Sequence, residues 1–236
     1  MAHIVLVHGA WHGGWCWQKL VPALGALGHS VNAIDLPGHG DDPLPPAQVT
    51  VDAYVARVGE ALNTGGEATY LLGHSMGGFV ITETAARFSE QVAGLIYLAA
   101  MLSPPGVNSG GLDPESLLLA ALAVDESTLT MTVQTEHLKE IFYQDCSDAD
   151  IALAKARLVP QKVLGEPPPA SDTQVQQWAN IPRYYITCTQ DKALPYSQQK
   201  RMIEQVGCER VIDMEASHSP FFSKPQALAK GIDSLV

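Results

Sequence analysis

The first candidate for chemistry in this chain is Ser75, at the centre of a Gly-x-Ser-x-Gly motif that spans Gly73–Gly77. Such a motif can place a serine on a sharp strand-to-helix turn, which exposes the hydroxyl as a nucleophile. The two glycines let the neighbouring backbone pass without a Cβ clash. The motif alone is weak evidence, because ordinary turns also use glycine and serine. A catalytic role for Ser75 therefore needs an acid and then a histidine further along the chain.

Asp191 and His218 supply those partners in the required order. Asp191 lies in the turn after the predicted strand Arg183–Cys188, and His218 is the only histidine C-terminal to it. The aspartate could instead cap the next helix, and the histidine could be an ordinary loop residue. In the catalytic interpretation, His218 accepts the hydroxyl proton of Ser75, and Asp191 fixes the tautomer of His218 and stabilises its imidazolium. The chain order favours this interpretation, which predicts a covalent acyl-serine intermediate.

A serine nucleophile of this kind also needs two N–H donors for the oxyanion that forms on its substrate. The glycine-rich segment His8–Trp15 directly follows the predicted strand Ile4–Val7, where one donor is expected. We assign the donors to the backbone N–H groups of Ala10 and Met76. The alternative is a glycine loop that only turns the chain. The helix that begins after Ser75 points its positive N-terminal end at the same place.

Short apolar runs alternate with helical patterns and position these residues. The expected strands are Ile4–Val7, Ser30–Ile34, Thr69–Leu72, Gly94–Leu98, Arg183–Cys188 and Arg210–Met214. The expected helices are Trp17–Leu27, Val51–Leu62, Met76–Phe88, Tyr196–Gln205 and Pro225–Leu235. Apolar strands joined by crossover helices form parallel sheets that are covered on both faces. The pattern predicts an α/β fold with a mostly parallel six-stranded sheet flanked by helices.

The rhythm of the sequence changes between residues 103 and 180. The segment contains three helical patterns, Glu115–Val124, Thr135–Tyr143 and Asp148–Leu158, and one short candidate strand, Leu129–Val133. We expect residues 1–102 and 181–236 to form the core. Residues 103–180 are then a small helical cap over the carboxyl edge of the sheet, where open α/β sheets bind ligands. The alternative is a peripheral insertion without a role in binding.

Composition restricts the class of protein. The chain has 236 residues, enough for one α/β domain with an insertion, and its net charge of −11 argues against nucleic acid or an anionic membrane as partner. The start of the chain has no signal-peptide pattern, and no stretch is long enough to span a membrane. Cys16, Cys146, Cys188 and Cys208 form no C-x-x-C pair, so we expect reduced thiols in a cytoplasmic protein. No residue cluster has metal-ligand spacing, and no metal is expected.

Several motifs resemble the plant methylesterase and hydroxynitrile-lyase family of the α/β-hydrolase superfamily, which includes salicylate-binding esterases. The motifs are His8-Gly9-Ala10-x-His12-Gly13-Gly14-Trp15-x-Trp17-x-Lys19-Leu20, Gly28-His29-x-Val31, Leu98-Ala99-Ala100, Tyr143-Gln144-x-Cys146-Ser147 and Cys188-Thr189-x-Asp191-Lys192. The resemblance covers nearly the whole chain. It implies an α/β-hydrolase fold and a cofactor-free serine hydrolase whose partner is a small-molecule ester of an apolar or aromatic acid.

Two positions separate esterases from lyases within that family. The lyases that resemble this chain carry Thr or Asn where Gly9 stands, and that side chain helps to hold the cyanohydrin. One subgroup also has Lys directly after the histidine, where this chain has Ser219. A lysine would supply positive charge for the leaving cyanide, and a serine cannot. Gly9 and Ser219 therefore indicate an esterase.

The substrate site is expected to be apolar. Its candidate contacts are Gly9, Trp11, Met101, Leu102, Leu194 and Phe221, together with residues of the cap. Ordinary core packing is the competing interpretation for each of these side chains. The segment Ser103–Asn180 looks shorter than the plant cap, and the tail of the histidine loop looks more like bacterial relatives. Substrate choice is therefore not carried over from the plant enzymes.

Two other functions use the same site. One is a different reaction, such as cyanohydrin cleavage, lactone hydrolysis or cofactor-independent dioxygenase chemistry. The other is a receptor-like protein that binds a ligand in the hydrolase pocket without turnover. The architecture alone does not choose among these functions, because it hosts many chemistries. The oligomeric state is equally open, and a homodimer is one option.

Overall fold

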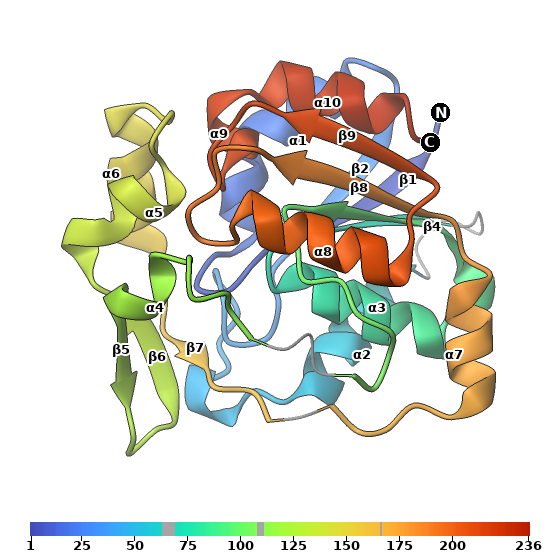
Figure 1. Cartoon of the computed structure of the whole chain (residues 1–236), viewed down its shortest axis with the longest axis horizontal. Coiled ribbons are helices and arrows are strands. Elements are labelled where there is room, and N and C mark those ends of the chain that lie inside the picture. The colour runs from blue at the N-terminus through green and yellow to red at the C-terminus, as the bar shows by residue number, and fades with distance from the viewer. Residues whose placement is uncertain (63–68, 108–110, 166) are drawn as a thin grey trace.

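A computed structural model describes residues 1–62, 69–107, 111–165 and 167–236 of the chain. Six parallel strands form the main sheet in the order β2-β1-β3-β4-β8-β9 (Figure 1). They are β1 (His3–Val7), β2 (Ser30–Ile34), β3 (Thr69–His74), β4 (Val92–Leu98), β8 (Arg183–Cys188) and β9 (Arg210–Met214). All six predicted strands are present, and the predicted α/β fold is confirmed.

The central strands are apolar on both faces because both faces of the sheet are covered. Successive side chains of a strand point to opposite faces. In β1, Ile4 and Leu6 belong to one hydrophobic core, whereas Val5 and Val7 belong to the other. All four side chains are fully buried. This double burial explains why β1 lacks the alternation of polar and apolar residues that a one-sided sheet shows.

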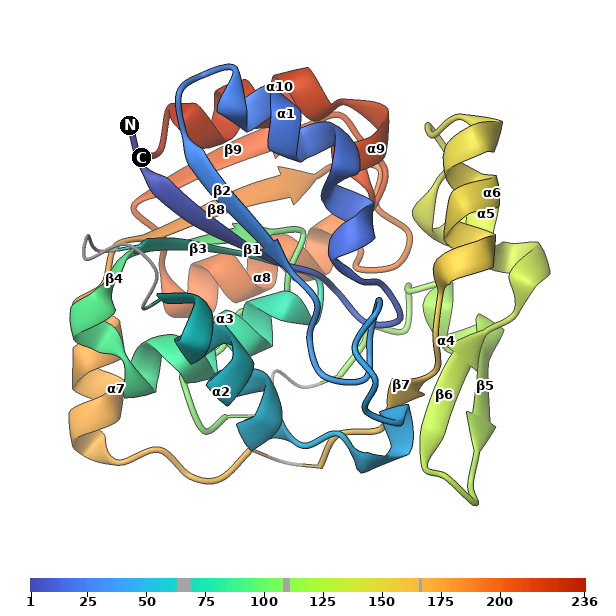
Figure 2. The same cartoon turned by 180° about the vertical axis from the view of Figure 1, so that it is seen from behind.

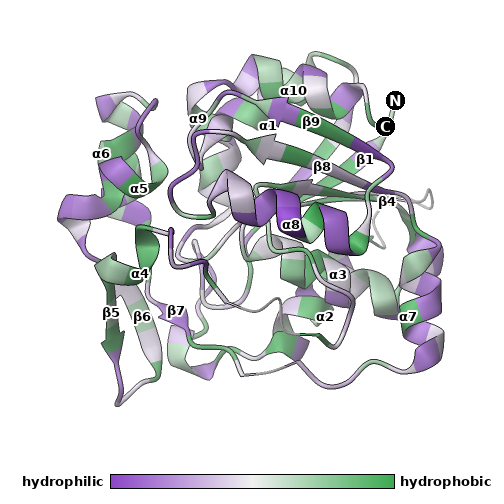
Figure 3. Ribbon diagram, viewed as in Figure 1, coloured by the Kyte–Doolittle hydropathy of each residue, from purple (hydrophilic) through white to green (hydrophobic). Residues whose placement is uncertain are grey.

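Two groups of helices cover the two faces, as the opposite views in Figures 1 and 2 show. One face carries α1 (Leu20–Gly25) and α10 (Pro225–Asp233), which pack against each other. The other face carries α2 (Val51–Leu62), α3 (Gly77–Arg87), α7 (Asp172–Ala179) and α8 (Tyr196–Val206). Figure 3 shows strongly hydrophilic residues along α8, interrupted by hydrophobic ones. None of the described helices is long and apolar enough to cross a membrane.

The predicted helix Trp17–Leu27 begins differently in the structure. Residues Gly14–Lys19 form a 3-10 helix, and only then does α1 begin at Leu20. Pro22 lies in the first turn of α1, where its missing N–H costs no hydrogen bond. The first residues of the predicted helix are therefore helical, but they form a 3-10 helix instead of an α-helix.

The cap segment contains a small sheet, so the expectation of a purely helical cap is wrong. The hairpin of β5 (Leu122–Asp125) and β6 (Thr130–Val133) pairs with β7 (Gln161–Lys162) in an antiparallel sheet. The predicted helix Glu115–Val124 shrinks to α4 (Leu118–Ala121). Short apolar runs do not distinguish a strand from a helix by periodicity. The predicted short strand Leu129–Val133 is present as β6, without Leu129.

Two helices complete the cap beside this sheet. They are α5 (Leu138–Phe142) and α6 (Asp148–Arg157), and α6 begins with a capping box between Ser147 and Asp150. The hairpin and these helices lie together beyond the carboxyl ends of β8 and β9 (Figure 1). Helix α7, in contrast, packs beside α3 on the main sheet. The proposed boundaries at residues 103 and 180 stay a prediction, and residues 108–110 and 166 lie outside the described part.

Candidate active site

Ser75 lies on the turn between β3 and α3 with φ of +54°, the left-handed region that non-glycine residues rarely adopt. The glycines of the motif allow this turn to form. A Cβ at Gly73 would lie 2.5 Å from the carbonyl oxygen of Gly77, and a Cβ at Gly77 would lie 2.6 Å from that of Val7. The start of α3 thus packs directly against β3 and β1, with Ser75 at the carboxyl edge of the sheet.

Backbone hydrogen bonds hold the strained turn in place. The Ser75 N–H donates to the Leu98 carbonyl over 3.3 Å, and the Ser75 carbonyl accepts from Met101 N over 2.9 Å and from Gly78 N over 3.1 Å. Leu98 ends β4, and Met101 lies in the loop after it. Because the neighbouring strand fixes both sides of the serine peptide, the conformation of Ser75 is set before any substrate binds.

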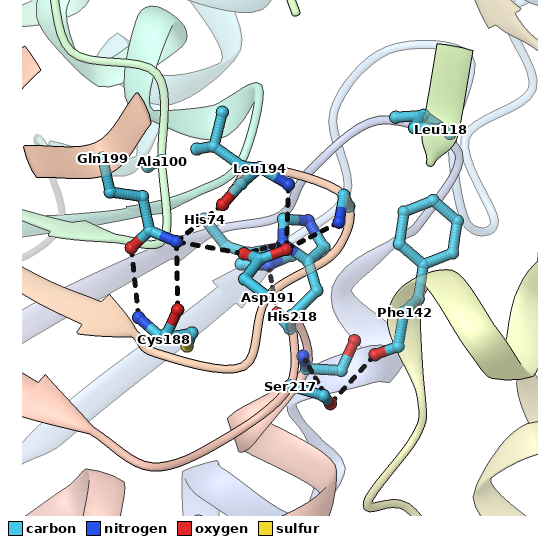
Figure 4. Close-up of polar contacts among 12 residues, drawn as sticks. His74, Ala100, Leu118, Phe142, Cys188, Asp191, Leu194, Gln199, Ser217 and His218 are labelled. Atoms are coloured by element: carbon cyan, nitrogen blue, oxygen red, sulfur yellow. Dashed lines mark hydrogen bonds and ion pairs between the residues drawn. The ribbon is translucent and has the colours of Figure 1, made fainter. Parts of the chain in front are cut away.

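Asp191 and His218 are brought together by the loops after β8 and β9. The Nδ1–H of His218 donates to Oδ2 of Asp191 over 2.6 Å, and both side chains are buried. Oδ1 of Asp191 accepts from the backbone N–H groups of Ala193 and Leu194, each over 2.8 Å. Figure 4 shows this carboxylate between its donors. Asp191 does not cap α8 (Tyr196–Val206), which begins without a side-chain cap; its Oδ1 instead holds the turn before that helix.

Gln199 of α8 is a further ligand of that carboxylate which the sequence did not single out. Its Nε2 donates to Oδ2 of Asp191 over 3.3 Å and to the Leu194 carbonyl over 2.7 Å, while its Oε1 accepts from Cys188 N over 3.0 Å (Figure 4). The side chain is fully buried. Its position eight residues after the aspartate, on the next helix, is the only sequence signal for this contact.

His74 ties the serine turn to the histidine loop. Its Nε2–H donates to the backbone carbonyl of His218 over 2.9 Å. Burial, together with the charge that a protonated His218 would carry, holds the pKa of His74 well below its usual value. The ring therefore stays neutral. Ser75, His218 and Asp191 remain a predicted triad: the structure hydrogen-bonds the last two and places Ser75 on the adjoining loop, next to His74.

The loop after β1 brings the predicted oxyanion donor Ala10 to the same edge. The Nδ1–H of His8 donates to the Gly9 carbonyl and the Nδ1–H of His12 donates to the Ala10 carbonyl, each over 2.8 Å. These two bonds orient the peptide groups on either side of Ala10. Among the described residues, the N–H groups of Ala10 and Met76 have no hydrogen-bond acceptor. Both are therefore free to donate to a substrate oxygen.

Burial keeps the two orienting histidines neutral. It holds the pKa of His8 well below its usual value and lowers that of His12 to about 4. Each ring then donates through Nδ1 and accepts through Nε2. His8 accepts from the Leu36 N–H over 3.1 Å, and His12 accepts from the Tyr143 hydroxyl over 2.7 Å. Tyr143 belongs to the cap segment, so His12 links the segment His8–Trp15, here called the oxyanion loop, to the cap.

We expect the stability of the fold to fall as the pH drops from about 6.5 to about 4, since the unfolded His12 binds a proton in this range and the folded one does not. The lowered pKa of His12 corresponds to a loss of about 3 kcal/mol in the free energy of unfolding over this interval. Urea unfolding of the wild type and of His12→Asn across this range measures the effect. The slope should be smaller in H12N than in the wild type and unchanged in H137Q. Equal slopes in all three proteins would contradict the assignment.

An apolar cavity of about 260 Å³ opens beside Ser75. Its wall combines the oxyanion loop, the serine turn and the cap. The lining residues are Ala10, Trp11, Ser75, Met76, Met101, Leu112, Leu118, Met131, Gln161, Lys162, Val163 and Leu164. The size suits a small ligand, and the thioethers of the three methionines adapt to irregular shapes. The cavity thus sets a largely apolar wall beside Ser75, Ala10 and Met76.

The predicted substrate contacts take different places. Trp11 and Met101 line the cavity. Leu102 and Leu194 are buried in the core on the α3 side, and Phe221 is buried in the core on the other side. The described wall of the cavity does not include these last three. Seven cap residues line it instead, and they were not predicted individually because short irregular elements hide which side chains face inward.

Gly9 stands directly against the serine. A Cβ at this position would lie 2.8 Å from Cβ of Ser75 and 3.0 Å from Nδ1 of His74. Ser219 is fully buried beside His218. A threonine at position 9 would displace the serine turn, which disfavours a cyanohydrin site built as in the lyases. The described residues also contain no group of three or more His, Cys, Asp and Glu side chains that could hold a metal ion.

Comparisons with known proteins show which family this chain belongs to. The model of the alpha/beta hydrolase family matches residues 4–230. Salicylic acid-binding protein 2 of Nicotiana tabacum is 29% identical over 98% of this chain and 95% of its own. The pyrethroid hydrolase of Sphingobium wenxiniae is 32% identical over 97% of this chain and 85% of its own. The crystal structure of a methylesterase from Arabidopsis is 26% identical, covers 100% of this chain and 98% of its own, and has a TM-score of 0.84. The predicted relationship is thus confirmed: the chain belongs to the alpha/beta hydrolase family.

Proposed function

We propose that this chain hydrolyses carboxylic esters of small apolar or aromatic acids through an acyl-enzyme on Ser75. One observation carries the proposal: Ser75 sits on a left-handed turn at an apolar cavity, and the adjoining loop holds the hydrogen-bonded pair of His218 and Asp191. The known relatives include proteins named as methylesterases and as a pyrethroid hydrolase. These names describe enzymes that cleave esters and so support the same chemistry here.

The first half of the reaction forms the acyl-enzyme. His218 accepts the hydroxyl proton as Oγ of Ser75 attacks the carbonyl carbon of the ester. The negative oxygen that results accepts hydrogen bonds from the N–H groups of Ala10 and Met76. When this intermediate collapses, the bond to the alcohol oxygen breaks and the alcohol takes the proton from His218. Asp191 stabilises the imidazolium in between.

The second half repeats the sequence with water. His218 accepts a proton from the water as its oxygen attacks the acyl carbon, and the same two N–H groups hold the new oxyanion. The bond to Oγ of Ser75 then breaks, and Ser75 recovers its proton from His218. The products are the free acid, the alcohol and the unchanged enzyme. No step uses a cofactor.

The cavity sets a limit on the acid part of the ester. Each buried methylene contributes up to about 0.8 kcal/mol, so kcat/KM should rise with acyl length until the cavity is full and then fall. A series of p-nitrophenyl esters from acetate to decanoate measures this limit. Met101→Trp, which narrows the cavity, should move the maximum to a shorter acyl chain, whereas L27W in the exposed turn after α1 should not.

One outcome of this series would contradict the proposed reaction, and another would contradict only the place given to the acyl group. A folded wild type without turnover of any ester would point to a receptor or to another reaction. Equal kcat/KM for all acyl lengths, unchanged in M101W, would leave ester hydrolysis intact but place the acyl group elsewhere.

We further propose a cytoplasmic location, supported by four free cysteine thiols. The homodimer stays a prediction.

A further inference from the structure

The loop that carries His218 is held from the cap by a carboxylate. Asp145 lies in the cap between α5 and α6, and its Oδ2 accepts from the backbone N–H of Ser217 over 3.2 Å. Its Oδ1 accepts from the hydroxyl of the same serine. Both oxygens of one carboxylate thus bind the residue directly before His218. Hydrogen bonds to an ionised acceptor are shorter and stronger than neutral ones.

The Ser217 hydroxyl has a second acceptor within reach. Its Oγ lies 3.2 Å from the Phe142 carbonyl, a contact that Figure 4 shows. A hydroxyl has only one hydrogen to donate, and the charged carboxylate is the closer and stronger acceptor. Ser217 is fully buried, whereas Asp145 is half-buried. The Asp145 carboxylate therefore covers the loop on the solvent side and is itself still in contact with water.

The contact completes the fixation of the histidine. Asp191 holds the ring of His218, and His74 holds its backbone carbonyl. Neither contact involves the peptide between Ser217 and His218, on the N-terminal side of the histidine. The Gln190 N–H holds the Ala216 carbonyl over 3.1 Å, one residue further back. Asp145 acts on that side through Ser217. Asp191 and His74 thus tie His218 itself to the core, and Asp145 ties the residue before it to the cap.

We propose that Asp145 is a positioning residue that keeps His218 directed at Ser75, so that the cap is part of the catalytic machinery and not only a cover. This inference rests on the proposed function, because it concerns the base of that reaction. The residue type is not set by the family resemblance, since Asp145 occupies the open position of the motif Tyr143-Gln144-x-Cys146-Ser147. Asp145 does not touch the substrate in this scheme.

The test compares Asp145→Ala, Asp145→Asn, Ser217→Ala and the double variant D145A/S217A on p-nitrophenyl butyrate. Misplacement of a catalytic group by about 1 Å can cost up to about 100-fold, so D145A should lower kcat about 10- to 100-fold. KM should change less than about twofold, because the cavity wall is untouched. D145N keeps an acceptor for the Ser217 N–H and should lose less. The double variant should be no slower than D145A, because both changes break one interaction.

Asp148→Asn is the matched control, since it removes an equal negative charge three residues away, on a side chain that is 94% exposed. It should keep the wild-type kcat. Unfolding curves show whether each variant is folded, and if D145A is not, S217A and D145N carry the comparison. A kcat within about twofold of the wild type in these folded variants, or losses in D145A and S217A that multiply in the double variant, would overturn the inference. A wild type that lacks ester turnover would overturn the proposed function and the inference with it.

Discussion

Replacing Ser75 by alanine is expected to lower kcat for p-nitrophenyl butyrate by roughly 10⁶-fold. The change removes the only atom that forms the acyl bond, while the N–H groups of Ala10 and Met76 and the cavity stay in place. A small residual rate over water, of order 10³-fold, should therefore remain. Substrate binding should be nearly unchanged, because the cavity wall loses only one hydroxyl. Initial rates with S75A, purified free of wild-type enzyme, measure the loss.

Ser103→Ala is the control for this experiment. Ser103 is a buried serine in the loop after β4, and its hydroxyl donates to the Val107 carbonyl over 2.9 Å. S103A makes the same chemical change near the same edge of the sheet and should keep the wild-type kcat. An S75A protein that turns over the ester at a rate close to that of S103A would exclude Ser75 as the nucleophile.

Asp191→Asn is expected to lower kcat by about 10⁴-fold without loss of the fold. The geometry gives the reason. Oδ1 of residue 191 accepts from two backbone N–H groups, so the asparagine oxygen takes that place and its NH₂ group faces Nδ1 of His218. The histidine must then offer a lone pair at Nδ1 and carry its hydrogen on Nε2. In that tautomer His218 cannot accept the proton of Ser75.

Measuring kcat for p-nitrophenyl butyrate at several pH values tests this effect. Asp213→Asn is the control. Asp213 is an exposed residue near the carboxyl end of β9 and accepts hydrogen bonds from the hydroxyls of Thr187 and Tyr196. D213N removes the same charge five residues before His218 but leaves the His218 tautomer unchanged, so its kcat should stay near the wild-type value. Similar losses in D191N and D213N would mean that general loosening of this edge, and not the tautomer, limits the rate.

The sequence was most informative where function and backbone geometry coincide. The glycine spacing around Ser75 predicts the strand, the turn and the helix together, because each glycine removes a Cβ that would clash with a defined neighbour. Asp191 and His218 each follow a parallel strand in the chain. The sequence therefore predicts that both lie at the carboxyl edge of the sheet, where all parallel strands end. Apolar runs such as β1 identify the sheet, since a strand buried on both faces needs apolar side chains throughout.

The cap could not be predicted in the same way. Its helices and strands are short, and a run such as Leu118–Asp125 fits a helix and a strand equally well by periodicity alone. The contacts that matter most there join residues far apart in the chain, such as Asp145 with Ser217 and Tyr143 with His12. No local pattern encodes such pairs. For the same reason, the cavity residues contributed by the cap became visible only in the folded structure.

The most direct test of the account is to identify the residue that an ester-like inhibitor modifies. Diethyl p-nitrophenyl phosphate transfers its diethylphosphoryl group to an activated serine oxygen and releases p-nitrophenolate, and the adduct is read by intact mass and by peptide mapping. We predict one group per chain, on the peptide that contains Ser75, with turnover lost in proportion to labelling and with labelling strongly slowed in D191N. Labelling of another residue, or full ester turnover by a completely labelled enzyme, would contradict the acyl-enzyme mechanism.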